Sequence, residues 1–361
     1  MTLPTTLQTW LQSQADALDR EQDLASEVLP KLSEAGLFGA GVPPQYGGSG
    51  GDVRDAIHAI ANVAEHSLTA AFVFWGHRTF IEYLLHSPNQ VLAERWIKRL
   101  VNGERGGATG LSNAMKFLSG IESLQITATP AQGGFQLDGS LAWVTNLRKE
   151  GFIAAAAVAS STDAPPAIVS FCNDMDGVQR SADLELMALR ASNTAAVKLK
   201  AVHINDDEVI HANAREYLPG VRPAFLGMQC GMSIGLARAS LRAAEGLCVA
   251  TRSQLSDRVT ELQQQLNAVV ETMSAGILDG SFKAKAAGLF RIRITLAEIV
   301  QQAVMLELQA SGGRAYLQDN DRNFARRWRE SAFIPIVTPS LTQLQIELQK
   351  QAAAQTQTPN Q

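Results

Sequence analysis

The chain has 361 residues, of which 46% are hydrophobic and 18% are charged, with a formal net charge of −4 and a pI near 5.9. This length allows two or three domains, or one large composite fold. The slightly acidic balance excludes a basic surface that would bind nucleic acid or an anionic membrane. We expect no membrane span and no secretory signal, because long apolar runs are missing. The expected location is therefore cytoplasmic.

The three cysteines, Cys172, Cys230 and Cys248, lie far apart and form no Cys-x-x-Cys pair. A sparse, odd number of cysteines is typical of reduced thiols in a reducing compartment. We expect neither a disulfide framework nor a metal site from them.

Residues 1–105 are predicted to form an N-terminal helical domain. Leu18, Leu24, Val28, Leu32 and Ala35 recur broadly on one helical face, and Gly36 ends that helix. Further helices are expected at the following ranges: 52–66, 70–85 and 88–101, the last with Pro88 in its first turn.

Residues 106–212 change character and are predicted to form a β domain. Short β-type runs alternate with turn residues, at 124–127, 135–137, 141–145, 152–158, 167–171 and 197–204. Strands at this spacing favour a compact antiparallel barrel or sandwich.

Residues 213–349 are predicted to form a C-terminal bundle of long helices. Gly227, Gly231 and Gly235 repeat every four residues, which suits a helix that another backbone approaches closely. Apolar residues at spacings of three and four indicate further helices at 255–273 and 282–309. The Gln- and Ala-rich segment 350–361 is expected to be a disordered tail. The fold class is therefore α+β, with helices, a β domain and a long-helix bundle in succession.

Two motifs resemble the acyl-CoA dehydrogenase family. Residues 42–50, V-P-P-Q-Y-G-G-S-G, resemble the family's V-P-x-x-Y-G-G-x-G loop, and residues 139–146, G-S-L-A-W-V-T-N, resemble its G-x-K-x-W-I-T-N strand. The resemblance implies that Trp143 packs against the isoalloxazine ring of FAD and that Thr145 hydrogen-bonds the flavin edge. Side chains alternate along a strand, so Trp143 and Thr145 share one face and can serve one heterocycle.

Two later segments extend the resemblance. Residues 190–194, R-A-S-N-T, are similar to the family's R-x-S-x-T, and residues 309–316, Q-A-S-G-G-R-A-Y, are similar to its Q-x-x-G-G-x-G-Y. The resemblance implies that Gln309, Gly312 and Gly313 approach the FAD of a neighbouring subunit, where bare backbone amides can cradle phosphate or ribose oxygens. A homo-oligomer, a tetramer or dimer, is therefore expected.

The sequence departs from the family at two cofactor segments. The family's T-E-P-x-x-G-S-D is replaced by residues 109–116, where Ser112 remains a hydrogen-bond donor, and its R-x-x-F-G is replaced by 252–256, where Arg252 remains. Ser112 and Arg252 are expected to contact the cofactor. The changes leave FMN possible in place of FAD.

The largest departure concerns the catalytic base. Dehydrogenation of an acyl thioester needs a carboxylate to remove the α-proton, worth roughly 3–5 kcal/mol of barrier. Thr338 or Pro339 occupies the family's usual Glu position, and Val221, beside Arg222, occupies its alternative one. Either a relocated base acts, with Glu330 and His77 as candidates, or the reaction needs no such base. Arg222 and Glu330 are the expected substrate contacts.

Three functional hypotheses follow. The first is an FAD-dependent oxidoreductase that acts on an acyl-CoA or similar thioester with a relocated base. The second is a monooxygenase on the same fold that uses reduced flavin and O₂. The third is a non-catalytic relative that serves as a binding or assembly partner. The flavin that the purified protein carries, and how that flavin responds to an acyl-CoA or to oxygen, would separate them.

Overall fold

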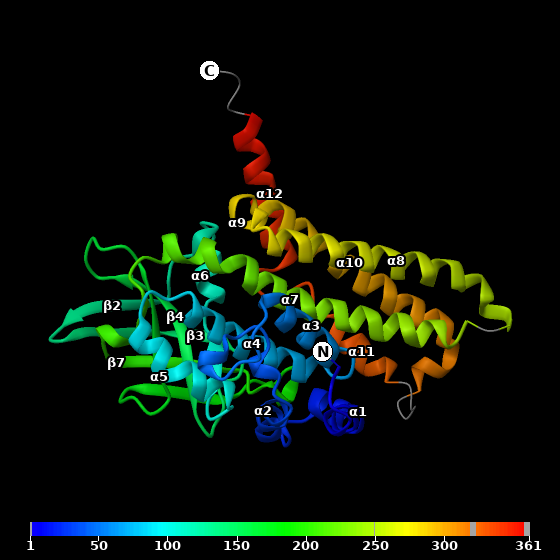
Figure 1. Cartoon of the computed structure of the whole chain (residues 1–361), viewed down its shortest axis with the longest axis horizontal. Coiled ribbons are helices and arrows are strands. Elements are labelled where there is room, and N and C mark those ends of the chain that lie inside the picture. Colours follow the sequence, from blue (N-terminus) through cyan, green and yellow to red (C-terminus); the bar gives the residue numbers. More distant parts are fainter. Residues whose placement is uncertain (1, 249, 318–322, 357–361) are drawn as a thin grey trace.

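The computed structural model describes residues 2–248, 250–317 and 323–356, with only the backbone given for 250–252 and 354–356. Helices α1 to α5 come first, a sheet with one short helix α6 follows, and helices α7 to α12 complete the chain. In Figure 1 the sheet lies at one end of an elongated molecule, and α7, α8 and α10 run together toward the other end. The α+β fold class predicted from the sequence is confirmed.

The N-terminal helices are α1 (Thr5–Arg20), α2 (Ala25–Glu34), α3 (Val53–Ala64), α4 (Leu68–Leu85) and α5 (Gln90–Val101). The single helix expected through Leu18 and Ala35 is two helices, because Glu21 adopts an extended conformation (φ −129°, ψ 161°). Gly36 follows α2 in the left-handed region (φ 69°), as its predicted role requires. Pro88 was expected in the first turn of α5, but Asn89 caps that helix and Pro88 precedes the cap.

The strands are β1 (Gly106–Thr109), β2 (Ile126–Ala131), β3 (Gly134–Val144), β4 (Phe152–Ser160), β5 (Ala167–Cys172), β6 (Val178–Asp183), β7 (Ala195–Asn205) and β8 (Val209–His211). Their order is β6-β7-β3-β2-β4-β5-β8, with β1 paired to β4. The sheet is mixed rather than purely antiparallel, because β4 runs parallel to both β1 and β2.

Three features of this region were not expected. Residues 135–137 and 141–145 were predicted as separate strands, but β3 runs through both because Gly139 (φ 145°) absorbs the irregularity within the strand. The short strands β6 and β8 were missed, because β6 is mostly polar and β8 has only three residues. The helix α6 (Ser112–Leu118) was also missed.

The C-terminal helices are α7 (Ala214–Glu245), α8 (Ser256–Leu278), α9 (Ser281–Ala284), α10 (Ala286–Ser311), α11 (Phe324–Ser331) and α12 (Leu341–Thr356). The glycines of α7 face α3, as the predicted close approach requires. A Cβ added at Gly231 would lie 2.8 Å from the carbonyl oxygen of Ile57, and one at Gly235 would collide with the carbonyl oxygen of Ala61. The two backbones are therefore in direct contact.

Helix α12 continues through Thr356, where a disordered tail from residue 350 was expected. Its Gln and Ala residues are good helix formers, so a polar composition does not exclude a helix here. The start of α12 has a capping box, since the Ser340 hydroxyl accepts from the Gln343 amide and the Gln343 side chain accepts from the Ser340 amide. Residues 357–361 lie outside the described residues.

Two hydrophobic cores organise the molecule. One unites the N-terminal helices with the C-terminal bundle, and the other is formed by the side chains between the strands. Helix α4 is buried on all sides in the first core and contacts β1 of the second. The candidate site lies beside α4 and the end of β3. None of the helices in the described ranges is long and apolar enough to cross a membrane.

Candidate functional site

A cavity of about 440 Å³ lies between α4, the end of β3 and two segments of chain at 186–189 and 332–343. Its walls come from parts of the chain that are distant in sequence. The lining residues are Phe72, Trp75, Thr109, Ser112, Lys116, Trp143, Thr145, Leu186, Met187, Ala188, Leu189, Thr194, Arg329, Ala332, Phe333, Ile336, Val337, Thr338, Ser340 and Gln343.

One wall of the cavity is aromatic. Phe72 and Trp75 lie one turn apart on α4, and their rings stack with centroids 5.7 Å apart and planes 9° apart. Phe333 meets the Phe72 ring edge-on, with the ring centroids 4.7 Å apart. The buried indole N–H of Trp75 donates to the carbonyl oxygen of Phe225 at 3.4 Å, so the ring is held in place.

Another part of the cavity wall carries hydroxyl groups. The Thr145 hydroxyl donates to the carbonyl oxygen of Ser192 at 3.3 Å and accepts from the Thr194 hydroxyl at 3.1 Å. The Thr109 hydroxyl is 2.8 Å from the phenol oxygen of Tyr83. Gly76 permits this arrangement, because a Cβ there would lie 2.8 Å from Cγ2 of Thr145. The cavity wall thus combines aromatic rings with hydroxyl groups that can form hydrogen bonds.

The mouth of the cavity is an exposed apolar rim. Trp143 is 63% exposed, and Met187 and Ile336 are 70% and 66% exposed. Trp143 and Thr145 both line the cavity, as their spacing on one strand predicts. Large apolar side chains gathered around an opening are typical of a ligand-binding surface.

The cavity carries little free charge. Its two cationic side chains are paired, Lys116 with Glu122 at 3.3 Å and Arg329 with Asp19 at 2.7 Å. Among the lining residues there is no aspartate, glutamate or histidine. No group of histidine, cysteine, aspartate and glutamate residues able to hold a metal occurs in the described ranges. A general base of the usual kind is therefore missing from the cavity wall.

The sequence model for the N-terminal domain of acyl-CoA dehydrogenases matches residues 3–104. Benzylmalonyl-CoA dehydrogenase of Aromatoleum aromaticum is 26% identical over 235 residues, which are 64% of this chain and 62% of that protein. Isovaleryl-CoA dehydrogenase of Pongo abelii is 23% identical over 336 residues, which are 87% of this chain and 78% of that protein. The chain belongs to the acyl-CoA dehydrogenase family.

Solved structures show the same acyl-CoA dehydrogenase fold. Butyryl-CoA dehydrogenase from Megasphaera elsdenii superposes with a TM-score of 0.81 at 17% identity, over 97% of this chain and 94% of that one. KijD3 in complex with FMN and a dTDP-sugar has a TM-score of 0.81 at 19% identity, over 97% and 91% of the two chains. Dibenzothiophene monooxygenase from Paenibacillus sp. A11-2 has a TM-score of 0.73 at 16% identity, over 96% and 94%. At such identities the likeness establishes the fold alone.

The residues present fit the ring system of a flavin, the cofactor bound by members of this family. The exposed face of Trp143 is free to stack on a flat heterocycle. The hydroxyls of Thr145 and Thr194 donate to Ser192 and Thr145, so they can accept hydrogen bonds from the polar edge of that heterocycle. Ser112, which the sequence also indicated as a cofactor contact, lines the same cavity.

Other residues expected from the family resemblance do not line the cavity. Gln309, Gly312 and Gly313 lie at the C-terminal end of α10, where the resemblance implies contact with another subunit. Arg252 lies on a short 3₁₀ helix, Ala250–Leu255, and its side chain lies outside the described residues.

Of the two residues at the usual base position, Thr338 lines the cavity and Pro339 does not. The Thr338 carbonyl oxygen accepts from Nε2 of Gln229 at 2.9 Å, and Oε1 of Gln229 accepts from Nε of Arg293 at 2.9 Å. Arg293 also donates to the carbonyl oxygen of Ile334. Burial lowers the pKa of Arg293, and no carboxylate among the described residues forms an ion pair with it. The buried guanidinium therefore holds the loop by hydrogen bonds to its backbone.

At the alternative base position, Val221 is buried in α7 and does not line the cavity. Arg222, an expected substrate contact, lies over the ring of Phe290 at 5.3 Å from its centroid and is also outside the cavity. The direction of α7 turns both side chains into the helical bundle.

His77, the first candidate for a relocated base, is buried and both of its ring nitrogens are occupied. Nε2 is 2.9 Å from the carbonyl oxygen of Leu100, and Nδ1 accepts from the amide of Gly107 at 2.8 Å. Burial lowers the pKa of His77 to about 3. The structure corrects this candidate, because a neutral imidazole with no free nitrogen and no access to the cavity cannot remove a substrate proton.

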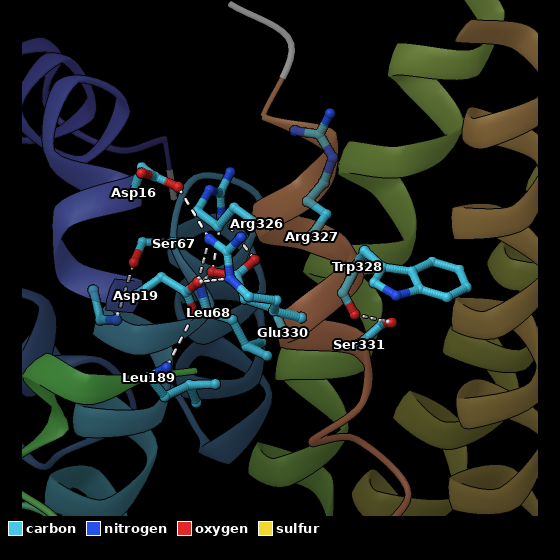
Figure 2. Close-up of polar contacts among 12 residues, drawn as sticks. Asp16, Asp19, Ser67, Leu68, Leu189, Arg326, Arg327, Trp328, Glu330 and Ser331 are labelled. Atoms are coloured by element: carbon cyan, nitrogen blue, oxygen red, sulfur yellow. Dashed lines mark hydrogen bonds and ion pairs between the residues drawn. The ribbon is translucent and has the colours of Figure 1, made fainter. Parts of the chain in front are cut away.

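Glu330, the second candidate and an expected substrate contact, is fully buried outside the cavity (Figure 2). Its carboxylate accepts from the amide of Leu68, at the start of α4, at 3.0 Å and from Nη1 of Arg326 at 2.7 and 2.8 Å. Burial raises its pKa. Glu330 therefore links α11 to the start of α4, because its hydrogen-bond partners are Leu68 of α4 and Arg326 of α11.

Several cavity residues were not singled out from the sequence. Phe72 and Trp75 lie on a helix that is apolar on every side, so their spacing carries no sign of a functional face. Phe333 and Met187 come from irregular segments without a family motif. The sequence does contain one local sign of this site. A glycine at position 76 lets α4 approach Thr145 closely.

Proposed function

We propose that this chain is a flavin-dependent oxidoreductase whose reaction uses no carboxylate base in the substrate cavity. Trp143 would stack on the isoalloxazine ring, and Thr145 and Ser112 would hydrogen-bond its polar edge. The observation that carries this proposal is the lining of the cavity, which contains hydroxyl, aromatic and aliphatic side chains, one amide and two paired cations, but no aspartate, glutamate or histidine. FAD is the proposed cofactor, and FMN is the alternative because the similar fold of KijD3 binds it.

Oxygenation is the reaction that suits this lining best. A reduced flavin, when bound, would supply two electrons, so that substrate, O₂ and reduced flavin would give an oxygenated substrate, water and oxidised flavin. One oxygen atom would enter the substrate and the other would leave as water when the O–O bond breaks. No α-proton has to be removed by the protein. The stacked rings of Phe72 and Trp75, together with Phe333, would exclude water and hold the substrate.

The charge distribution favours a neutral, apolar substrate for the inner cavity. Lys116 and Arg329 each have a carboxylate partner, so neither side chain offers an uncompensated positive charge to an anion. A substrate carboxylate placed beside the aromatic wall would be desolvated without compensation. An apolar, ring-containing compound fits these walls.

Dehydrogenation of an acyl thioester is the second candidate. Its support is the similarity to isovaleryl-CoA dehydrogenase and benzylmalonyl-CoA dehydrogenase. It requires a base that the described cavity residues do not supply, because Thr338 is neutral and Glu330 and His77 lie elsewhere. The residues at the two family positions therefore favour oxygenation.

A cytoplasmic homo-oligomer completes the proposal. The free thiols of Cys172 and Cys230 are buried, and burial raises the pKa of each to about 12, so neither is a reactive thiolate.

The glycine-rich end of α10 lies away from the chain's own cavity, which suits a contact with the cofactor of a second subunit.

The test compares two reactions of the flavin-loaded protein. Anaerobic addition of a medium-chain acyl-CoA should leave the oxidised flavin spectrum unchanged, both in the wild type and in Thr338→Glu. Reduced flavin mixed with oxygen should give a transient oxygenated-flavin absorbance. Rapid bleaching of the wild type by acyl-CoA would overturn the proposal in favour of a dehydrogenase, and bleaching only in Thr338→Glu would indicate a degraded dehydrogenase site.

The flavin position is tested separately. Trp143→Ala should weaken FAD binding about tenfold, as expected for the loss of one stacking partner. Val91→Ala is the control, because Val91 is 54% exposed on α5 and does not line the cavity. Equal FAD dissociation constants for wild type and Trp143→Ala would contradict the proposed ring position.

A further inference from the structure

Asp19 is a buried acid near the end of α1, a helix that does not line the cavity. Its side chain has no exposed surface, whereas Asp16 of the same helix is exposed. A buried carboxylate is stabilised only where its oxygens are hydrogen-bonded. The partners of Asp19 therefore show what the buried charge does.

The two oxygens of Asp19 serve two segments of the cavity wall. Oδ1 accepts from the backbone amide of Leu189 at 3.0 Å, and Oδ2 accepts from Nε of Arg329 at 2.7 Å. Both Leu189 and Arg329 line the cavity. Figure 2 shows the bond between Asp19 of α1 and Leu189 of the β-domain loop. One carboxylate thus joins segments that are 170 and 310 residues away in the sequence.

Leu189 needs such support because of its backbone conformation. It has φ 58° and ψ 34°, in the left-handed region that side-chain-bearing residues rarely adopt. The hydrogen bond that the Leu189 amide donates to Asp19 compensates for this conformation. The residues before it, Leu186, Met187 and Ala188, form one side of the cavity. The shape of that side therefore depends on a contact with α1.

Arg329 and Glu330 extend the same frame along α11. Arg329 reaches α1 through Asp19, and Glu330 reaches α4 through the Leu68 amide. The chain that follows α11 supplies Phe333 and Thr338 to the cavity. The position of this segment is thus tied to α1 and α4 by two consecutive side chains.

We propose that Asp19 is a positioning residue for the cavity, which it shapes through Leu189 and Arg329 without touching the ligand. The proposal rests on the proposed function only in taking this cavity as the flavin site. It predicts that ligand binding depends on a helix outside the site. A role limited to anchoring α1 would change stability and leave the loop and the binding constant unchanged.

The experiment uses three variants of the full chain. Asp19→Ala removes both hydrogen bonds, and Asp19→Asn keeps a carbonyl oxygen that can accept from the Leu189 amide. Asp16→Ala is the matched control, since Asp16 contacts the same Arg329 at 3.0 Å but does not contact Leu189. Each protein is measured by amide hydrogen exchange over residues 186–192, by FAD titration and by thermal unfolding.

We expect exchange at Leu189 and its neighbours to be at least tenfold faster in Asp19→Ala, and the FAD dissociation constant to rise about tenfold. Asp19→Asn should recover most of the exchange protection, and Asp16→Ala should match the wild type. The proposal is overturned if Asp19→Ala leaves exchange over 186–192 unchanged, or if Asp16→Ala has the same effect. Should Asp19→Ala fail to fold, Asp19→Asn decides, because wild-type exchange together with a tenfold loss of FAD binding would contradict positioning through Leu189.

The two measurements separate this inference from the proposed function. Hydrogen exchange reports on the Asp19–Leu189 contact in the protein without any ligand. A wild-type chain that ignores added FAD would contradict the flavin proposal, while the exchange result would still confirm or overturn the role of Asp19 in shaping the loop.

Discussion

Thr338 shows how one residue can take a family position without the family chemistry. Thr338 lines the cavity, and its carbonyl oxygen accepts a hydrogen bond from Gln229. A hydroxyl at this point can donate or accept a hydrogen bond, but it cannot remove a weakly acidic proton at neutral pH. Since Gln229 and Arg293 fix the backbone, the loop is built to keep this wall in place. The residues of the cavity wall can therefore orient a ligand and exclude water, but Thr338 supplies no base.

His77 makes a testable contribution to stability at the residue scale. Its folded pKa is about 3, against 6.5 in the unfolded chain, because burial disfavours the charged ring. The unfolded state therefore binds a proton that the folded state does not between these values. The stabilisation is complete above pH 6.5 and is lost as the pH falls toward 3. From pH 7 to pH 5.5, His77 should lower the free energy of unfolding by about 1 kcal/mol, measured by urea titration.

The comparison for His77 uses two variants. His77→Gln keeps a donor and an acceptor but cannot titrate, so its stability should fall about 1 kcal/mol less than that of the wild type over the same pH interval. His203→Gln removes an exposed histidine of β7 and should retain the wild-type dependence. Identical pH dependence in His77→Gln and the wild type would show that His77 is not the group responsible.

At the scale of elements, the contact between α3 and α7 decides how tightly the two helical regions pack. Gly231 and Gly235 place the α7 backbone against the carbonyl groups of α3, where no side chain has room. These carbonyl groups already accept hydrogen bonds within α3, so the contact adds dispersion rather than new hydrogen bonds. Because α4 and α10 also pack on α7, a shift of this helix would reach the cavity.

Gly235→Ala should destabilise the protein by on the order of 1–3 kcal/mol, since the new methyl group would collide with the backbone oxygen of Ala61. Gly220→Ala, in the same helix, has nothing within 4 Å of the added Cβ. That control should be neutral, or stabilising by about 0.5–1 kcal/mol through helix propensity. Chemical unfolding of the two variants measures the difference, and equal stabilities would contradict the packing argument.

At the scale of the whole molecule, large apolar side chains remain uncovered at the end of the bundle. Tyr316 is 91% exposed and Trp328 is 49% exposed, near the glycines that follow α10. Exposed aromatic side chains of this kind are common at interfaces between subunits. They lie on the C-terminal helices, through which we propose that the chain assembles.

We expect a dimer or tetramer at micromolar concentration by light scattering, and Tyr316→Glu should shift the population toward smaller species. Val91→Glu is the control, because Val91 is 54% exposed on α5, away from the C-terminal helices. A wild-type protein that is monomeric at this concentration would contradict the proposed assembly. A shift caused equally by Val91→Glu would indicate a general effect of added charge.

The sequence by itself determined the elements whose signal is local. Periodic apolar residues placed the long helices, because one buried face repeats every 3.6 residues. The alternation of a strand put Trp143 and Thr145 on one side, and both line the cavity. The glycines of α7 predicted a close contact with another helix, because two helix backbones can approach this closely only where a side chain is missing.

The tertiary structure alone decided which residues meet in the cavity and which do not. Phe72 and Phe333 are brought together by the docking of α4 beside the segment after α11, a contact that no local pattern encodes. Glu330 and His77 looked like available acid–base groups, yet packing buries both and saturates them with hydrogen bonds. Burial and partnership depend on contacts between distant parts of the chain, and these set the pKa and accessibility of a group. Sequence spacing specifies neither.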